Sequence, residues 1–355
     1  MKTFSSIRDL ESLVGREIGV SDEIVLDQAM IDGFAEVTGD EHWTYVDTER
    51  CAREAPHGQT MAHPALLLGL ITQLVGKIVA FTANMPTTFS YGFNGIRFPA
   101  PARAGQRVRL RLGVARIERF RGGLQSYWTV VLESPGSEEL CLSGEWVTRT
   151  YLHIGFLRRV KLILRRLGAL SAGGHRELST ETKGRQTAAP SQAPQRTMRS
   201  FEDVADFLGK QVGLSDWIVI DQEKIDAFAK VTGDYYWTHS DPERCKRESP
   251  YGRTIAHGAL MLGLIPMLVR QIVDWDGNIA MVTCAFDKIR YPAPALSGSR
   301  FQVLLGLSRM ERLESDARIC WTVLFQAEGA EKPCLAAEWI TQARFQAGRQ
   351  VHSAS

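Results

Sequence analysis

One stretch of this chain occurs twice. Residues 31–64 read IDGFAEVTGDEHWTYVDTERCAREAPHGQTMAHP, and residues 225–258 read IDAFAKVTGDYYWTHSDPERCKRESPYGRTIAHG. The register persists downstream, where NGIRFPAPARAG at 94–105 matches DKIRYPAPALSG at 287–298. A repeat as long as a domain indicates two tandem domains of one fold, because solenoid repeats are only about 20–50 residues long.

The two copies differ at two positions that matter for acid–base chemistry. Both keep a Gly-Asp pair, but His239 of the second copy is Tyr45 in the first, and Gly258 is Pro64. An imidazole can act as a base near neutral pH, whereas an unperturbed phenol with a pKa of about 10 cannot. The pattern predicts one working site, in the second copy, and one degenerate site in the first.

Composition places the chain among ordinary globular proteins. Its 355 residues, 44% of them hydrophobic, are enough for two cores, and a formal net charge of +2 gives no sign of a nucleic-acid partner. The six cysteines show no metal-ligand spacing, and the N-terminus lacks the apolar stretch of a signal peptide. We therefore expect a cytoplasmic protein with free thiols, no bound metal and no cofactor.

A long apolar segment follows the repeated motif in each copy, at 63–81 and 257–275. At about 1.5 Å per residue, such a helix approaches the length that spans a membrane. Lys77 and Arg270 interrupt the two segments, so we expect core helices of a globular domain. Upstream, the spacing of apolar residues in IDAFAKVTG predicts another helix, which ends at Gly233 and leaves the motif in a loop.

Alternating residues follow each long helix. In the second copy they include FQVLLGLSRMERL at 301–313 and ARICWTVLFQAE at 317–328, which are rich in β-branched and aromatic residues. This pattern is typical of long antiparallel strands. One long helix wrapped by an antiparallel sheet is the hotdog arrangement. The predicted fold class is therefore α+β, a double hotdog that forms a pseudo-dimer within one chain.

The chain divides into four predicted parts. We expect an N-terminal hotdog domain at 1–152, a basic amphipathic helix at 153–170, a flexible linker at 171–200 and a C-terminal hotdog domain at 201–347. The linker is rich in Ser, Thr, Gln, Ala and Pro. The basic helix has two interpretations. It packs on its own domain, or it contacts an anionic membrane surface or an acidic partner.

A resemblance to a known family rests on the string FAKVTGDYYWTHSDPERCKRESPYGRTIAHGALMLGL at 228–264, with IRYPAPALSG downstream. The string resembles the MaoC-like hydratase/dehydratase family, which includes the (R)-specific enoyl-CoA hydratases, and both copies share the resemblance. It implies that Asp234 and His239 are the catalytic pair, with Asp40 alone in the first copy. Family members commonly have Asn or Gln where this chain has Tyr236, so the carboxamide that helps to orient water is missing here.

The chemistry implied by this family gives a role to Gly258 as well as to Asp234 and His239. Adding water to a double bond conjugated with a thioester needs a base, an acid and donors for the enolate oxygen. Asp234 and His239 are expected to hold one water. Gly258 lies at the start of a helix, where an unpaired N–H can hold the thioester oxygen, whereas Pro64 has no N–H to donate.

The predicted function is that of a hydro-lyase in fatty acid metabolism. It would hydrate a trans-2-enoyl thioester or dehydrate an (R)-3-hydroxyacyl thioester, carried by CoA or an acyl carrier protein, and further oligomerisation is compatible with the fold. The alternative is a non-catalytic protein that binds or scaffolds an acyl thioester. Tyr236, in place of the carboxamide, favours this alternative.

Three further groups have simpler interpretations. His257 has a counterpart in the degenerate copy, so we interpret it as structural at the helix entry. A metal site made of His257, Asp234 and His239 is not expected, because no spacing typical of zinc supports it. Arg97 and Arg290 precede the two Pro-Ala-Pro turns, where structural salt bridges are favoured over phosphate binding.

Overall fold

The structure is a computed structural model. The predicted basic helix at 153–170, and 171–193 of the predicted linker, lie outside its described residues. The described residues are 1–82, 88–137, 139–151, 194–275, 279–314 and 316–345.

The two halves contain the same elements in the same order. The first half comprises β1 (Lys2–Phe4), α1 (Ile7–Glu11), β2 (Arg16–Val20), β3 (Ile24–Val25), α2 (Gln28–Thr38), α3 (Trp43–Val46), α4 (Thr48–Glu54), α5 (Pro64–Ile78), β4 (Val79–Phe81), β5 (Thr88–Arg97), β6 (Arg107–Phe120), β7 (Gly123–Glu133) and β8 (Leu140–Tyr151). The second half comprises β9 (Arg196–Met198), α7 (Phe201–Ala205), β10 (Gln211–Leu214), β11 (Ile218–Ile220), α8 (Gln222–Thr232), α9 (Trp237–Ser240), α10 (Pro242–Glu248), α11 (Gly258–Arg270), β12 (Val273–Trp275), β13 (Ile279–Arg290), β14 (Ser299–Arg312), β15 (Asp316–Ala327) and β16 (Leu335–Phe345).

One twelve-stranded sheet runs through both halves. Its main path is β10-β14-β15-β16-β13-β5-β8-β7-β6-β2, with β11 added on β14 and β3 on β6. The halves join where β13 and β5 pair antiparallel, with Phe286 opposite Ile96 and Ile289 opposite Phe93. These four side chains are almost completely buried. The predicted double hotdog and its internal pseudo-dimer are thus confirmed.

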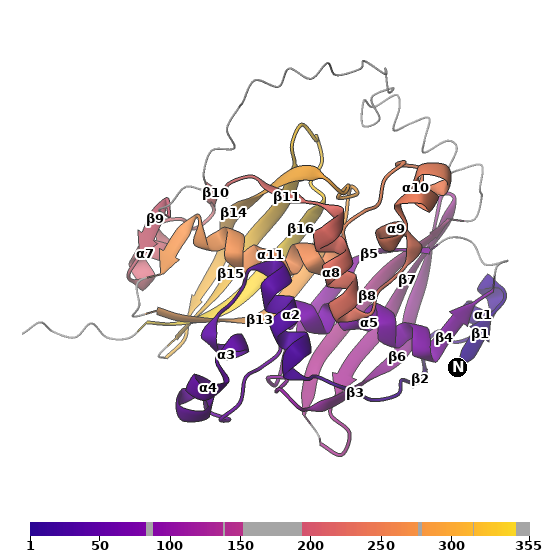
Figure 1. Ribbon diagram of the computed structural model, residues 1–355, viewed down its shortest axis with the longest axis horizontal. Coiled ribbons are helices and arrows are strands. Elements are labelled where there is room, and N and C mark those ends of the chain that lie inside the picture. The colour runs from indigo at the N-terminus through magenta and orange to yellow at the C-terminus, as the bar shows by residue number, and fades with distance from the viewer. Residues whose placement is uncertain (83–87, 138, 152–193, 276–278, 315, 346–355) are drawn as a thin grey trace, which may run out of the picture.

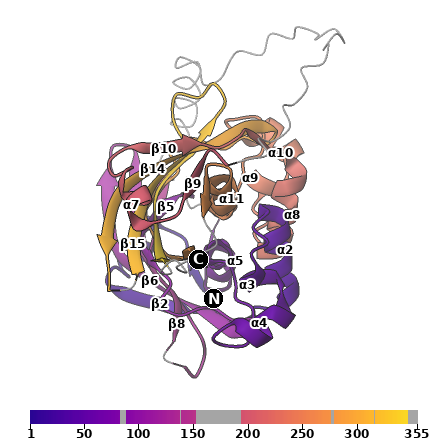
Figure 2. The same ribbon diagram turned by 90° about the vertical axis from the view of Figure 1, so that its left-hand side faces the viewer.

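The helices form two layers on the concave side of this sheet (Figure 1). The long helices α5 and α11 lie inside the curve, and α2 and α8 lie outside them, as the view in Figure 2 shows. The layers pack across the two halves. A Cβ added at Gly69 of α5 would lie 2.8 Å from Thr232 Cγ2, and one at Gly263 of α11 would lie 2.7 Å from Thr38 Cγ2. Each long helix therefore presses on the helix that precedes the other half's Gly-Asp pair.

Two details of the predicted helices are wrong. The motif was expected in a loop, but short helices α9 and α10 occupy most of it, because Asp241 accepts a hydrogen bond from the Arg244 N–H (2.8 Å) and caps α10. The long helices are also shorter than expected, since β4 and β12 take up their last residues. In the described ranges, no helix has both the length and the hydropathy to cross a membrane.

The predicted linker extends too far toward the C-terminus. Strand β9 falls inside the predicted range 171–200, and it pairs parallel with β12, with Arg196 opposite Val273. The sequence near Arg196 is polar, so composition alone did not separate it from the linker. Its backbone pairing assigns it to the second half, as β1 belongs to the first through β4. The other predicted boundaries stay predictions.

The buried joint predicts that the halves hold together without a covalent connection. We expect that a protease site engineered near residue 175, once cleaved, leaves both halves in one particle, because β13, β5 and the crossing helices bury apolar surface. Gel filtration of the cleaved protein without denaturant measures this. Two separate peaks would contradict the joint.

Candidate active site

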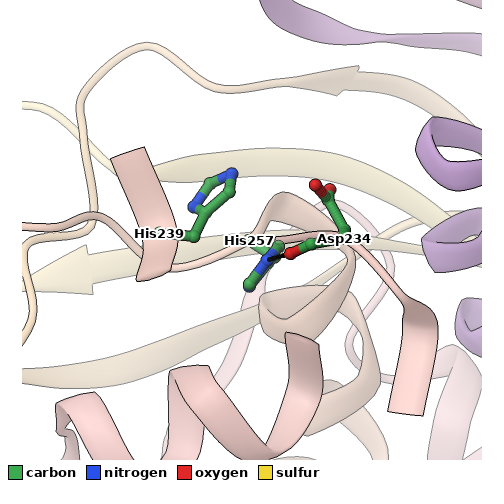
Figure 3. A group of neighbouring side chains, drawn as sticks. All are labelled: Asp234, His239 and His257. Atoms are coloured by element: carbon green, nitrogen blue, oxygen red, sulfur yellow. Dashed lines mark hydrogen bonds between the residues drawn. The ribbon is translucent and has the colours of Figure 1, made fainter. Parts of the chain in front are cut away.

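Asp234 is placed by the end of helix α8. Gly233 follows the helix with φ at 72°, the left-handed conformation that favours glycine, and its N–H donates to the Ala229 carbonyl (2.8 Å). This turn brings Asp234 into the group drawn in Figure 3. The Asp234 Oδ1 accepts a hydrogen bond from the Tyr236 N–H (3.3 Å).

His239 lies on the short helix α9, and its tautomer follows from one hydrogen bond. Its Nδ1 is 2.7 Å from the Ile255 carbonyl oxygen, which can only accept. Nδ1 must therefore carry the proton. The lone pair of a neutral ring is then on Nε2, where a general base needs it.

His257 occupies the N-cap position of α11, without a side-chain hydrogen bond to the helix, and completes the group. Its Nε2 donates to the Asp234 backbone carbonyl (2.9 Å), so the lone pair of the neutral ring is on Nδ1. That atom is buried, and it has no hydrogen-bond partner within the part of the chain that the structure describes. The ring stacks on His239 with the centroids 3.9 Å apart. The interpretation of His257 as only structural is therefore incomplete. Its Nε2 holds the Gly-Asp turn by a hydrogen bond, and its Nδ1 keeps a free lone pair.

Both imidazoles of this group are held neutral. Burial lowers the pKa of His239, and the charge of Asp234 opposes this only in part. Burial, reinforced by the neighbouring His239, lowers the pKa of His257 well below its ordinary value. At neutral pH both rings are therefore uncharged, and the free nitrogen of His239, Nε2, can accept a proton.

The same three residues have the donor types of a metal site. One ligand atom from each of Asp234, His239 and His257 lies within 4.8 Å of the others. Imidazole nitrogen and carboxylate oxygen are common zinc donors. The spacing in the sequence did not predict this grouping, because Gly233 and the entry to α11 bring it together only in the fold. The absence of a metal stays a prediction.

Gly258, the third predicted site residue, is the first residue of α11. It must be glycine, because a Cβ there would overlap the ring of Tyr291, 2.6 Å from Cε1. Sequence reasoning did not single out Tyr291. The signal was available, since Tyr291 aligns with Phe98 in the other copy, just as Gly258 aligns with Pro64.

In the first half, the equivalent carboxylate is already paired. The Asp40 side chain is 4% exposed, its Oδ2 lies 3.2 Å from His63 Nε2, and its Oδ1 pairs with Arg270. Burial would raise the pKa of Asp40, but His63 and Arg270 outweigh it and lower that pKa. The Tyr45 ring packs on His63, with centroids 5.2 Å apart, and burial raises the pKa of its phenol. Asp40, His63 and Tyr45 are therefore not available as a free base.

Arg270 reaches Asp40 from the other half of the molecule. It is the last residue of α11, and the aligned residue at the end of α5 is Gly76. No arginine is therefore aligned to reach Asp234 in the same way. Sequence reasoning attributed the degenerate site to Tyr45 and Pro64, and it missed this third difference because Arg270 lies outside the first copy.

The two arginines before the Pro-Ala-Pro turns do not form the expected salt bridges among the described residues. Arg290 instead donates to the Phe93 carbonyl (3.1 Å) and to Asn94 Oδ1 (2.7 Å), and Arg97 donates to the Ile96 carbonyl (3.0 Å). Arg290 thus ties β13 to β5 at the joint between the halves. The acceptors are backbone and amide oxygens, and the sequence alone does not show which of these oxygens an arginine will contact.

Comparisons with known proteins agree with this geometry. The MaoC like domain matches residues 9–131 and 203–323, so the chain belongs to the MaoC-like dehydratase family and carries two of its domains. Among characterised relatives, 3-hydroxyacyl-thioester dehydratase Z of Mycobacterium tuberculosis is 40% identical over 151 residues, which are 41% of this chain and 98% of the relative. Nodulation protein N of Rhizobium meliloti is 35% identical over 148 residues, 41% of this chain and 92% of that protein.

Solved structures share the fold. A MaoC-like dehydratase superposes with a TM-score of 0.63 at 16% identity, covering 95% of this chain and 100% of the other. A Mycobacterium tuberculosis protein described as a double hotdog superposes with a TM-score of 0.56 at 13% identity, covering 93% and 96%. At these identities the likeness concerns the fold alone.

The two neutral imidazoles predict a loss of stability in acid. Because His239 and His257 have lowered pKa values in the folded state, the unfolded chain binds more protons below about pH 6.5, and stability falls as pH drops. Urea unfolding at pH 7 and pH 5 should show this loss, and His239→Gln should reduce it. The exposed His57 provides the control, since His57→Gln should leave the loss unchanged. Equal wild-type stability at both pH values would contradict the assignment.

Proposed function

We propose that the protein is a hydro-lyase that interconverts a trans-2-enoyl thioester and an (R)-3-hydroxyacyl thioester. One observation carries the proposal. A half-buried, neutral His239 with its lone pair on Nε2 lies beside the Asp234 carboxylate, next to a helix start. The dehydratase name of the 40% identical relative supports the same reaction type and a thioester substrate.

In the hydration direction, Asp234 and His239 hold one water against the double bond. His239 Nε2 accepts a proton from this water while the water oxygen forms a bond to C3, and the electrons of the double bond move onto the thioester oxygen as an enolate. A proton then passes from the site to C2, and the carbonyl re-forms. The balance is one water added, with the imidazole and carboxylate returned to their starting states.

Gly258 is proposed to hold the enolate oxygen. Its N–H is at the start of the 13-residue helix α11, where the helix dipole favours negative charge. No described residue accepts a hydrogen bond from this N–H. In the first half Pro64 provides no such donor.

We infer that an amide from the other half takes the place of the carboxamide missing at Tyr236. A Cβ at Gly233 would lie 2.6 Å from Gln73 Cδ, so the Gln73 amide packs directly on the Gly-Asp turn. This contact weakens the main reason for the alternative function, a non-catalytic thioester-binding scaffold. All six cysteines are free, which supports a reducing compartment, and we infer the cytoplasm.

The proposal predicts that the two halves respond differently to mutation. Asp234→Asn or His239→Ala should lower kcat/KM by about 10²-fold or more, the effect of losing a general acid or base. Asp40→Asn, the matched control in the first half, should change it little if folding is intact. Loss of absorbance of crotonyl-CoA and of longer enoyl thioesters, on CoA and on acyl carrier protein, measures this.

Three results separate the rival interpretations. Wild-type protein that binds these thioesters but does not hydrate them would support the scaffold. Equal losses from Asp40→Asn and Asp234→Asn would contradict a single working site. Activity that disappears with a chelator and returns with zinc would show that Asp234, His239 and His257 hold a metal.

The Arg270 contact also predicts how the working site can be silenced. Gly76 is exposed, and a Cβ there meets no atom within 4 Å, so Gly76→Arg is tolerated and also gains helix propensity. By analogy with Arg270, the new guanidinium should pair with Asp234 and lower kcat/KM by about 10²-fold or more. Gly76→Ala is the control and should remain active. Full activity of Gly76→Arg would show that an arginine at this position of α5 does not engage the Asp234 carboxylate.

A further inference from the structure

The Tyr291 hydroxyl is buried, and none of the described residues forms a hydrogen bond with it. The residue follows the end of β13, and its N–H donates to the Tyr91 carbonyl (3.1 Å), which fixes the backbone at the joint between the halves. The ring lies over Gly258, and the hydroxyl oxygen is among the atoms that a Cβ at Gly258 would overlap. The oxygen is buried and unpaired among the described residues.

An arrangement of this kind needs a reason. Burying a hydroxyl without a partner costs free energy, and folded proteins usually avoid it. Phenylalanine would fill the same space without that cost, and Phe98 occupies the equivalent position in the first half. The hydroxyl is therefore unfavourable in the free protein and useful only when something else reaches it.

The surroundings show what could reach it. The Gly258 N–H points from the start of α11, and the unpaired Nδ1 of His257 is one residue away. Burial raises the pKa of Tyr291, so the phenol keeps its proton and remains a donor. Two donors thus lie at one helix start, beside Asp234 and His239. A group with a single oxygen that accumulates negative charge fits them.

We propose that the Tyr291 hydroxyl donates a hydrogen bond to the substrate's thioester oxygen, together with the Gly258 N–H. The inference rests on the proposed function and adds a second donor to it. The first half lacks both donors, since Phe98 has no hydroxyl and Pro64 has no N–H. The two positions therefore differ as a pair between the working and the degenerate site.

The test is Tyr291→Phe, which removes only the hydroxyl. It should lower kcat/KM by about 10²–10³-fold, as the loss of one oxyanion donor does, mainly through kcat. The same variant should melt at a temperature higher by about 2 °C or more, because an unpaired buried hydroxyl is gone. A merely structural tyrosine would lose stability instead. Tyr91→Phe, which removes a hydroxyl elsewhere at the joint, should leave activity unchanged.

A spectroscopic measurement separates this inference from the proposed function. The carbonyl stretch of butyryl-CoA labelled with ¹³C at C1 should fall in frequency on binding to the wild type, and should return toward the free value in Tyr291→Phe. Saturated butyryl-CoA undergoes no hydration, so the shift reports the hydrogen bond even if turnover fails. An unchanged bound frequency in Tyr291→Phe, or full activity with no gain in melting temperature, would overturn the inference while leaving Asp234 and His239 in their roles.

Discussion

The ion pair that engages one of the two site carboxylates depends on how the long helices cross. Each of α5 and α11 packs on the helix that precedes the other half's Gly-Asp pair, so closely that Gly69 and Gly263 have no room for a side chain. Arg270 at the end of α11 consequently pairs with Asp40, and Gln73 of α5 packs on Gly233, the residue before Asp234. A substitution at the end of one helix thus acts on the site of the other half. This is why the duplicated chain can specialise its sites without altering the fold.

The electrostatic asymmetry follows directly from that crossing. Asp40 is buried between His63 and Arg270, and the ion pair offsets the cost of burying its charge. At the equivalent position Gly76 replaces the arginine, and Gln73 brings an uncharged amide to Gly233. One half therefore has a carboxylate engaged in structural contacts. The other has a carboxylate beside two neutral imidazoles, and this is the arrangement suited to moving protons to and from a water.

Sequence predicted the parts of this account that depend on local pattern. The alternation after each long apolar segment indicated strands wrapped around a helix, and the resemblance to the MaoC-like family implied that Asp234 and His239 act as a pair. In the fold, His239 lies on the short helix α9, which begins three residues after Asp234. Contacts between the halves could not be predicted from the sequence. Arg270 is near Asp40 only after β13 pairs with β5 and the helices cross. His257 was missed for another reason, since its presence in both copies concealed that only one of them leaves its Nδ1 unpaired.

The central claim is that the chain has a single working thioester site, and ligand stoichiometry tests it most directly. Titration calorimetry with saturated butyryl-CoA, which binds without reacting, counts the sites per chain. The account predicts one equivalent per chain in the wild type, and a large loss of affinity when both donors to the thioester oxygen are removed by Gly258→Pro and Tyr291→Phe, the residue pair of the first half. Two equivalents per chain, or one that survives this double replacement unchanged, would contradict it.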